Sequence, residues 1–448
     1  MSKLSNSTRR LIGGFLAIAV FMTGDGFELT FLSKYMVDHG FAATQASLLI
    51  TLYGLFAAAA AWTSGVLAEM FGAKRLMLIG ATWWIVIQIV FLGVALPSGS
   101  YPFILAVYAV RGVGYPLFIY SFVVLMAETV DPAKLSSAMG WFWTSFSMGI
   151  GVFGAYLPSY IIPVLGEYKT FWCAMPFAIV GTIMCILLVP NTKGRASEGL
   201  DRAEQIRELT KGATILVKNR QVAFAAIVRV INNLVLYGFP VIMPLYLSTK
   251  NNGGGGWFPT ETWMRFWGFV FVVTLFANVF WGWFGDRFGW MMPVRWFGCL
   301  LLTVSTLFVY YVPQFFGANA PLMWIGFFLV GVGTCAFVPL TAVVTTLAPG
   351  EQGAALSAYN LAAGLTTFAG PLIATIVMPI AGFGGVCWAY AILYAFAFVL
   401  TFFIRPKQPG FDIKGRRLSE EERIAEVESI TGDIAEVREA EASLTKQA

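Results

Sequence analysis

Hydrophobic residues occur along this chain in long runs that are separated by short polar segments. A run of about 20 apolar residues is long enough for a helix to cross the hydrocarbon core of a bilayer. Such runs predict twelve membrane spans, six on each side of a polar segment near the middle of the chain. The expected spans are 11–37, 45–68, 76–96, 103–128, 137–162, 171–189, 222–247, 263–284, 291–311, 321–347, 354–380 and 386–404.

Polar residues interrupt this pattern at the middle and at the end of the chain. The middle segment is rich in Lys and Arg, and the last segment is rich in Glu. In the last segment Ser419 precedes three glutamates and is a plausible N-cap, so we expect an amphipathic surface helix that extends to Ala442. The expected domains are an N-terminal six-helix half over 1–190, a cytoplasmic linker over 191–220, a C-terminal six-helix half over 221–405 and a cytoplasmic tail over 406–448.

A loop motif occurs once in each half. The first copy contains Gly65, Glu69 and Gly72, and the second copy, at a constant offset, contains Gly282, Asp286, Arg287 and Gly289. A repeat of half the chain predicts two pseudo-symmetric halves related by an axis along the membrane normal. Transporters of this architecture bind substrate between the halves near the bilayer midplane. We therefore expect an all-α membrane protein of twelve transmembrane helices that acts in transport.

Composition and charge agree with a multi-pass membrane protein. Hydrophobic residues make up 58% of the chain and charged residues 12%, and the mean hydropathy is +0.73. Lys and Arg of the short loops concentrate on the side that both termini share, which predicts cytoplasmic termini. This loop bias accounts for the net charge of +5, and no basic cluster with interleaved aromatic residues points to nucleic acid. We expect a monomer in a lipid bilayer.

Three charged residues stand deep inside the expected spans of the first half, away from the span ends. Asp25 and Glu28 share one face of the first span, and Arg111 lies in the fourth. A charge at bilayer depth costs about 2.5 to 3.5 kcal/mol and is kept where it meets a partner, a cavity or a substrate. Because a guanidinium stays protonated, Arg111 requires a carboxylate partner. The cluster is either a proton switch or a static salt bridge. We favour Asp25 as the proton carrier and Glu28 as a substrate-binding residue or gate.

A polar stripe runs along the seventh span. Its members are Arg229, Asn232, Asn233 and Tyr237, which are three or four residues apart and therefore share a helical face. Such a stripe is unfavourable against lipid, so it either lines a cavity or packs against another helix. Both interpretations remain open at this point.

Residues that form metal centres or catalytic sites do not occur in recognisable patterns. The single histidine, His39, falls in an expected external loop, and the five cysteines lie in apolar spans without paired spacing. No nucleophile with a histidine partner, phosphate-binding glycine loop or large soluble domain is present. We therefore expect no metal and no cofactor, and a membrane enzyme or sensor is disfavoured.

The repeated loop resembles the signature loop of the major facilitator superfamily. The second copy matches it, whereas the first has Glu69 for the usual aspartate and Met70 where a basic residue is typical. The resemblance implies that Glu69 and Asp286 contact a helix end and hold one conformation closed. The stretches 111–122 and 232–240 look like the polyol porter group, which includes bacterial ribitol and D-arabinitol transporters. This implies a linear polyol as substrate and proton symport.

A polyol site requires amides, carboxylates and tyrosines for the hydroxyls and aromatic faces for the carbon chain. In addition to Glu28 and the stripe of the seventh span, we expect substrate contacts from Tyr115, Tyr120, Trp141, Trp143 and Asn360. The leading hypothesis is proton-coupled uptake of a pentitol, such as ribitol or D-arabinitol, by alternating access across the bacterial inner membrane. The alternatives are an organic anion such as a dicarboxylate, clamped by Arg111 and Arg229, or a sugar.

Overall fold

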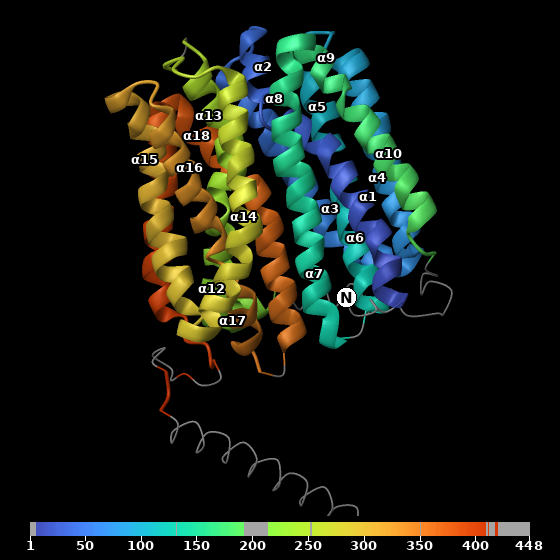
Figure 1. The fold of residues 1–448 in the computed structure, drawn as a ribbon, viewed down its shortest axis with the longest axis vertical. Helices are drawn as coiled ribbons and strands as arrows, with labels where there is room; N and C mark the ends of the chain where they lie inside the picture. The colour runs from blue at the N-terminus through green and yellow to red at the C-terminus, as the bar shows by residue number, and fades with distance from the viewer. Residues whose placement is uncertain are drawn as a thin grey trace, which may run out of the picture.

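The computed structural model describes residues 6–130, 132–191, 214–250, 253–349, 351–408, 411 and 417–419. Within these residues the named elements are helices, which form two groups standing side by side (Figure 1). The all-α prediction is therefore confirmed. The expected tail helix from Ser419 to Ala442 and most of the expected linker lie outside the described residues, so these predictions and the domain boundaries beside them stay predictions.

Helices satisfy their backbone hydrogen bonds internally, which is what an apolar chain in lipid requires. The first group consists of α1 (Asn6–Leu29), α2 (Leu32–Asp38), α3 (Ala43–Phe71), α4 (Ala73–Val90), η1 (Phe91–Ala95), α5 (Tyr101–Arg111), α6 (Gly114–Thr129), α7 (Pro132–Ser147), η2 (Met148–Phe153), α8 (Gly154–Leu165), α9 (Glu167–Trp172) and α10 (Ala174–Leu188). The second group consists of α12 (Arg220–Asn232), α13 (Leu234–Ser248), α14 (Thr260–Phe288), η4 (Pro293–Leu300), α15 (Leu301–Phe316), α16 (Ala320–Cys335), α17 (Leu340–Thr346), α18 (Gln352–Leu400) and η5 (Thr401–Phe403).

Eleven helical stretches of the described chain are long and apolar enough to cross a membrane, and the last of them turns back on itself. This stretch contains α18, which has non-helical backbone angles at Gly382. The Tyr390 hydroxyl donates to the Gly370 carbonyl at 2.7 Å, although residues 20 positions apart in a straight helix are about 30 Å apart. The α18 segment is therefore a hairpin, and the expected twelve spans are reached when its two arms are counted separately.

The repeat that the sequence predicts is visible in α3 and α14. Each helix has 29 residues and ends at a glycine with positive φ, 89° at Gly72 and 103° at Gly289. In each case the glycine N–H donates to the carbonyl four residues earlier. A glycine adopts this conformation without the strain that a side chain would cause. The two copies of the loop motif therefore end equivalent helices in the same way.

Four of the expected spans are broken in their interior: the first and the fourth span of each half. The breaks separate α1 from α2, α5 from α6, α12 from α13 and α16 from α17. Three of them lie beside polar residues of interest, because Arg111 ends α5, Asn232 ends α12, and Thr30 follows the end of α1. Discontinuous helices of this kind line the binding sites of many transporters.

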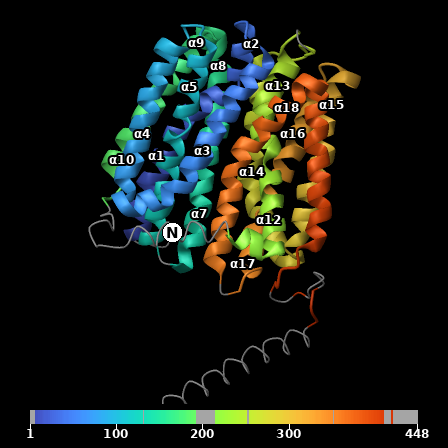
Figure 2. The same cartoon turned by 180° about the vertical axis from the view of Figure 1, so that it is seen from behind.

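The two halves are hydrogen-bonded to one another toward the end of the bundle that carries α2, opposite the mark for the N-terminus (Figure 1). Much of this contact joins α3 to α18, which lie beside each other when the molecule is seen from behind (Figure 2). Ser47 and Thr51 of α3 contact the Thr375 hydroxyl of α18 at 2.7 and 2.9 Å. Deeper along the same seam, the Thr367 hydroxyl donates to the Gly54 carbonyl at 3.1 Å.

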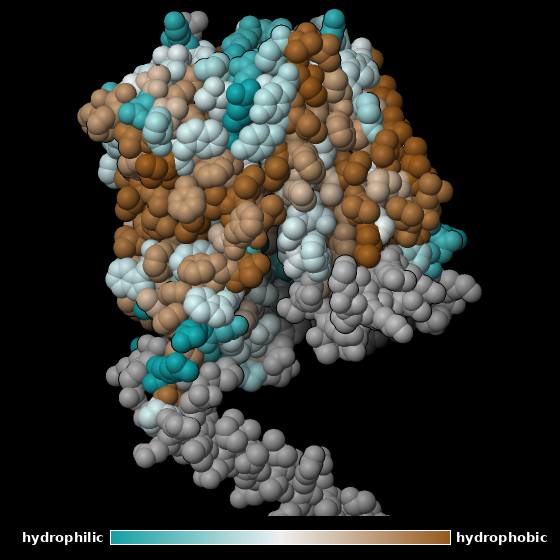
Figure 3. Space-filling model, in the orientation of Figure 1, coloured by the Kyte–Doolittle hydropathy of each residue, from teal (hydrophilic) through white to brown (hydrophobic). Residues whose placement is uncertain are grey.

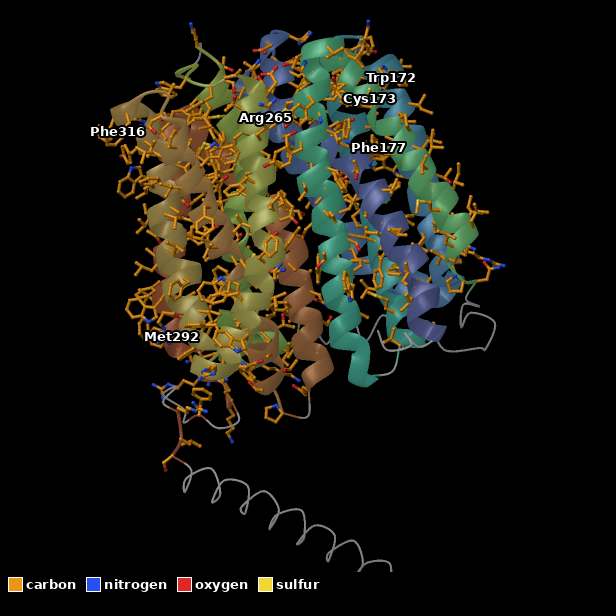
Figure 4. The ribbon with its side chains drawn as sticks, in the orientation of Figure 1. Trp172, Cys173, Phe177, Arg265, Met292 and Phe316 are labelled. Carbon is orange, nitrogen blue, oxygen red and sulfur yellow. The ribbon has the colours of Figure 1, made fainter. Side chains whose placement is uncertain are left out.

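Two further contacts close this end. The Ser33 hydroxyl of α2 donates to the Pro240 carbonyl at 3.1 Å; Pro244, four residues on, has no N–H to offer that carbonyl. On the opposite face, Arg265 of α14 reaches the seam (Figure 4), and its guanidinium carbon lies 4.7 Å from the ring centre of Tyr160 on α8. Among the described residues we find no hydrogen bond between the halves toward the other end. The molecule is closed at the α2 end.

Apolar side chains cover the outside of the bundle as a belt around its middle (Figure 3). Exposed apolar side chains of the molecule include Val164, Phe276, Val279 and Ile380, which are 73% to 81% exposed. In water so much exposed apolar surface would be unfavourable, whereas in lipid it meets acyl chains. The surface therefore agrees with a protein that spans a membrane many times.

Candidate functional site

Arg111 joins the two carboxylates of α1 into one buried cluster. Its Nη1 donates to Glu28 Oε2 at 2.7 Å, and its Nη2 donates to Asp25 Oδ1 at 3.3 Å. The three side chains are at most 1% exposed. Asp25 and Glu28 reach the same guanidinium because they share a face of α1, and Arg111 stands at the break that ends α5. The three charges singled out in the sequence are therefore in direct contact.

Neutral donors from α3 and α4 complete the cluster. Trp84 Nε1 donates to Asp25 Oδ1 at 2.6 Å, and the Tyr53 hydroxyl donates to the same oxygen at 3.1 Å. Gln88 Nε2 donates to Glu28 Oε1. The guanidinium carbon lies 4.5 Å from the ring centre of Trp84, which is a cation–π contact. These groups satisfy oxygens that would otherwise be buried without partners.

The cluster contains two acids and one base. With both carboxylates ionised its net charge is −1, and with one of them protonated its net charge is zero. An unbalanced charge is unfavourable away from water, so one proton removes the imbalance. The two acids differ in access: Asp25 lines the cavity described below, whereas Glu28 has no exposed surface and is not part of the cavity wall. A proton or a substrate in the cavity therefore reaches Asp25 first.

Sequence reasoning did not find the neutral members of this cluster. Gln88 carried a usable signal, since it is a polar residue inside the third expected span. Tyr53 and Trp84 carried none, because aromatic residues make up 16% of the chain and most of them pack or face lipid. Their role depends on the approach of α3 and α4 to α1, which spacing along the chain does not predict.

A cavity of about 750 Å³, including the part open to solvent, lies between the two halves. Its walls are mostly apolar and aromatic, with a few polar groups among them. The lining residues are Asp25, Leu29, Thr30, Ile50, Tyr53, Gly54, Tyr115, Phe146, Ile150, Leu236, Tyr237, Pro240, Trp267, Phe271, Thr367 and Pro371.

Two of the expected substrate-binding residues lie on this wall. Tyr115 is on α6 of the first half, and Tyr237 is on α13 of the second half. Neither hydroxyl has a hydrogen-bond partner among the described residues. The hydroxyl of Tyr53, by contrast, is already bound to Asp25. The cavity therefore presents one free phenol from each half and one carboxylate.

The polar stripe of the seventh span is divided between packing and the cavity. Tyr237 reaches the cavity, whereas Asn232 is 3% exposed and accepts a hydrogen bond from Arg229 Nη1 at 2.8 Å. The Arg229 guanidinium also lies 5.0 Å from the ring centre of Tyr359 on α18. Asn233 occupies the break between α12 and α13. Arg229 thus bonds Asn232 within α12 and packs against α18 through Tyr359, and neither Arg229 nor Asn232 is on the cavity wall in this structure.

Four other expected contacts lie outside the cavity wall in this structure: Tyr120, Trp141, Trp143 and Asn360. Trp141 is 62% and Trp143 38% exposed, and Asn360 is also exposed. On α7 it is Phe146 that lines the cavity. Trp141 and Trp143 are five and three residues from it along the chain.

The two copies of the loop motif lie at the end of the bundle opposite α2. Gly65 and Glu69 are in the last turns of α3, and Gly282, Asp286 and Arg287 are in the last turns of α14. Asp286 Oδ1 accepts a hydrogen bond from Trp290 Nε1 at 3.0 Å, within its own loop. The side chain of Glu69 lies outside the described residues. Among the described residues we find no contact of Asp286 with a helix end, so this implication of the family resemblance stays a prediction.

The fold and the site together define a multi-pass membrane transporter with a central cavity between two related halves. The family model of the Major Facilitator Superfamily matches residues 14–276 and 256–438. The chain therefore belongs to the major facilitator superfamily, a family of transporters rather than enzymes.

Bacterial transporters are similar to this chain over most of its length. A ribitol transporter of Klebsiella pneumoniae is 46% identical over 402 residues, which cover 90% of this chain and 93% of that protein. A D-arabinitol transporter of the same organism is 44% identical over 405 residues, covering 90% and 94%. An alpha-ketoglutarate permease of Bacillus subtilis (strain 168) is 35% identical over 403 residues, covering 90% and 91%.

Proposed function

We propose that this protein imports a linear polyol, a pentitol such as ribitol or D-arabinitol, together with a proton across a bacterial cytoplasmic membrane. The similarity to the ribitol and D-arabinitol transporters supports the substrate class. The observation that carries the proposal is the position of Asp25, whose carboxylate belongs both to the cavity wall and to the buried charge cluster. Substrate and coupling proton thus meet at one group.

The cavity wall matches the chemistry of a polyol. Aromatic rings such as Trp267 and Phe271 face the C–H groups, and Asp25, Tyr115 and Tyr237 bind hydroxyls. Proline adds acceptors: Pro240 and Pro371 lack an N–H, so the carbonyls four residues earlier, at Leu236 and Thr367, lose a helical donor. Both of these residues line the cavity. A polyol hydroxyl both donates and accepts, and therefore uses carboxylate, phenol and carbonyl partners alike.

The charge balance of the cluster provides the coupling. When Asp25 is ionised, the cluster has a net charge of −1 at the cavity wall, and when it is protonated the cluster is neutral. Movement of the halves past one another encloses the site, and a neutral site is enclosed at a lower cost than a charged one. We propose that Asp25 takes up its proton with substrate on one side and releases it on the other.

The loop bias of Lys and Arg supports an orientation with both termini in the cytoplasm. Under this orientation the closed α2 end is the outer end, and the structure represents the inward-facing state. Substrate and proton leave to the cytoplasm from this state. Because one chain encloses the whole cavity, we propose that the protein acts as a monomer.

A dicarboxylate is the second candidate, and the similarity to the alpha-ketoglutarate permease favours it. A dicarboxylate site needs cationic clamps. Arg111, however, already binds two carboxylates, and Arg229 binds Asn232. Among the described residues no Arg or Lys is part of the cavity wall. The geometry therefore favours the polyol over the anion.

Uptake into proteoliposomes tests the substrate class. The purified protein is reconstituted, and entry of radiolabelled ribitol is measured with an excess of unlabelled D-arabinitol, ribitol or 2-oxoglutarate outside. We expect the two polyols to suppress uptake and 2-oxoglutarate to leave it unchanged, with protein-free liposomes as the control. Entry of labelled 2-oxoglutarate without entry of ribitol would overturn the proposal in favour of the anion.

A further inference from the structure

Thr30, a residue of the cavity wall, combines three properties. It is 1% exposed, it lines the central cavity, and its Oγ1 has no hydrogen-bond partner among the described residues. A buried hydroxyl without a partner is unfavourable, and the large majority of such groups are paired. A partner is therefore expected, and the cavity that Thr30 lines is the space where a partner can bind.

The position of Thr30 follows from the break in the first span. The residue lies after Leu29, where α1 ends, and before α2 begins. Inside a helix a threonine hydroxyl commonly donates to the carbonyl four residues earlier, as Thr23 does to Ala19 at 2.8 Å. Thr30 has no such bond. Its hydroxyl is therefore not used by a bond to the described residues.

The backbone of the same residue is fixed from the other half. The Thr30 carbonyl accepts a hydrogen bond from Trp263 Nε1 of α14 at 2.8 Å. Trp263 is fully buried and stacks on Trp267, with ring centres 5.4 Å apart, and Trp267 lines the cavity. The hydroxyl is thus held at a defined place on the wall by contacts that do not use it. Such preorganisation is typical of a binding residue.

We propose that Thr30 is a substrate-binding residue, whose hydroxyl exchanges a hydrogen bond with one hydroxyl of the bound polyol. This inference rests on the proposed function. The other polar groups of the wall are placed differently: the Thr367 hydroxyl donates to Gly54, and that of Tyr53 donates to Asp25. Thr30, Tyr115 and Tyr237 are the wall residues whose hydroxyls are free among the described residues, and Thr30 was not anticipated from the sequence.

The test compares Thr30→Val, which removes the hydroxyl and keeps the branched shape, with Thr30→Ser, which keeps the hydroxyl. Ribitol affinity is measured by titration calorimetry on the full-length protein in detergent, and the melting temperature is measured with and without ribitol. We expect Thr30→Val to weaken ribitol binding roughly tenfold and Thr30→Ser to stay within about threefold of wild type. Without ligand, Thr30→Val should melt at a temperature equal to or above that of wild type, because an unpaired buried polar group has been removed.

Thr306→Val is the matched control. Thr306 is also fully buried, and its Oγ1 is also without a partner among the described residues, but it lies on α15 and not on the cavity wall. This variant should share any gain in melting temperature and leave ribitol affinity unchanged. A series of deoxypentitols sharpens the test, since the analogue without the contacted hydroxyl should bind wild type and Thr30→Val equally well.

The outcomes distinguish an error in the assignment of Thr30 from an error in the proposed function. If wild type binds ribitol and Thr30→Val binds it equally tightly, the assignment of Thr30 is wrong and the proposed function stands. If Thr30→Ser loses as much affinity as Thr30→Val, the effect is one of shape and the assignment is again wrong. If wild type binds 2-oxoglutarate and no polyol, the proposed function fails, and the assignment of Thr30 fails with it.

Discussion

Each half of this transporter has an arginine near a break in a membrane-spanning helix, but the two arginines contact different kinds of side chain. In the first half Arg111 holds two carboxylates, Asp25 and Glu28, beside the ring of Trp84. In the second half Arg229 holds the neutral side chain of Asn232 and lies over the ring of Tyr359. The arginine of the first half therefore binds two titratable groups, whereas that of the second half makes a neutral packing contact.

This difference shows that two halves with the same backbone fold can carry different functional side chains. Backbone features recur, as in the glycines that end α3 and α14 with nearly the same angles. The acids do not recur, since the α12 and α13 segment contains neither Asp nor Glu. We therefore assign proton coupling to the first half, and to the second half a share of the cavity wall through Tyr237, Trp267 and Thr367.

The largest expected effect comes from the two arginines. Arg111→Lys should reduce transport at least a hundredfold, because an ammonium cannot serve both carboxylates and stack on Trp84 at once, and breaking a buried pair costs roughly 3 to 5 kcal/mol. Arg229→Lys should retain most of the activity, since its partners are neutral. Labelled ribitol uptake by equal amounts of monodisperse protein measures both. Equal losses would show that the halves do not differ as described.

The next effect sharpens the comparison at the cavity wall. Tyr115→Phe and Tyr237→Phe each delete one free phenol, from the first and the second half respectively. Each should weaken ribitol binding roughly tenfold, as expected for one lost hydrogen bond of about 1 to 1.5 kcal/mol. The control is Tyr394→Phe, whose hydroxyl donates to the Asn232 carbonyl away from the cavity. Calorimetry on the three variants measures this, and unchanged affinity in either cavity variant would remove that tyrosine from the site.

A smaller effect is expected at Asn232. Its side chain accepts from Arg229 and does not line the cavity, so Asn232→Ala should act on stability more than on binding. We expect a loss of about 1 to 3 kcal/mol in the free energy of unfolding, with ribitol affinity within about threefold of wild type. Thermal unfolding and calorimetry are compared on the same sample. A tenfold loss of affinity at wild-type stability would instead place Asn232 in the binding site.

The smallest expected effect is on the opening of the molecule at its closed α2 end. Trp263→Phe removes the N–H that donates to the Thr30 carbonyl and keeps an aromatic ring. Loss of one hydrogen bond worth about 0.5 to 1.5 kcal/mol should raise the population open at the α2 end a fewfold. Spin labels on α2 and on the loop before α14, read by pulsed electron resonance, report this population. A distance distribution identical to that of wild type would show that this contact does not hold the end closed.

The charges of the site could be predicted from the sequence because they are rare in apolar runs. Asp25, Glu28 and Arg111 were recognisable for that reason, and Gln88 could have been. Thr30 could not, because hydroxyl residues are tolerated throughout membrane helices, and its free hydroxyl depends on the break after Leu29. Trp141 and Trp143 lie off the cavity wall in this structure, and the sequence signal for them was weak because aromatic side chains suit lipid as well as sugar alcohols.

The fold was more predictable than the site. Runs of apolar residues locate the spans, and the loop repeat identifies the two halves, because both signals come directly from the bilayer as solvent. The close spacing of the last two spans was less evident. The turn itself was located, because the expected spans end at 380 and begin at 386, and Gly382, with a positive φ of 64°, lies between them.

Ribitol accumulation driven by an imposed pH gradient tests the central claim, that Asp25 couples the proton to the substrate. Proteoliposomes containing wild type or Asp25→Asn are diluted into acidic buffer, and internal ribitol is followed; exchange of internal for external ribitol is measured in parallel without a gradient. Wild type should accumulate ribitol above the external concentration, whereas Asp25→Asn should only exchange it, because an amide mimics a permanently protonated acid. Accumulation by Asp25→Asn at the wild-type level would contradict the account.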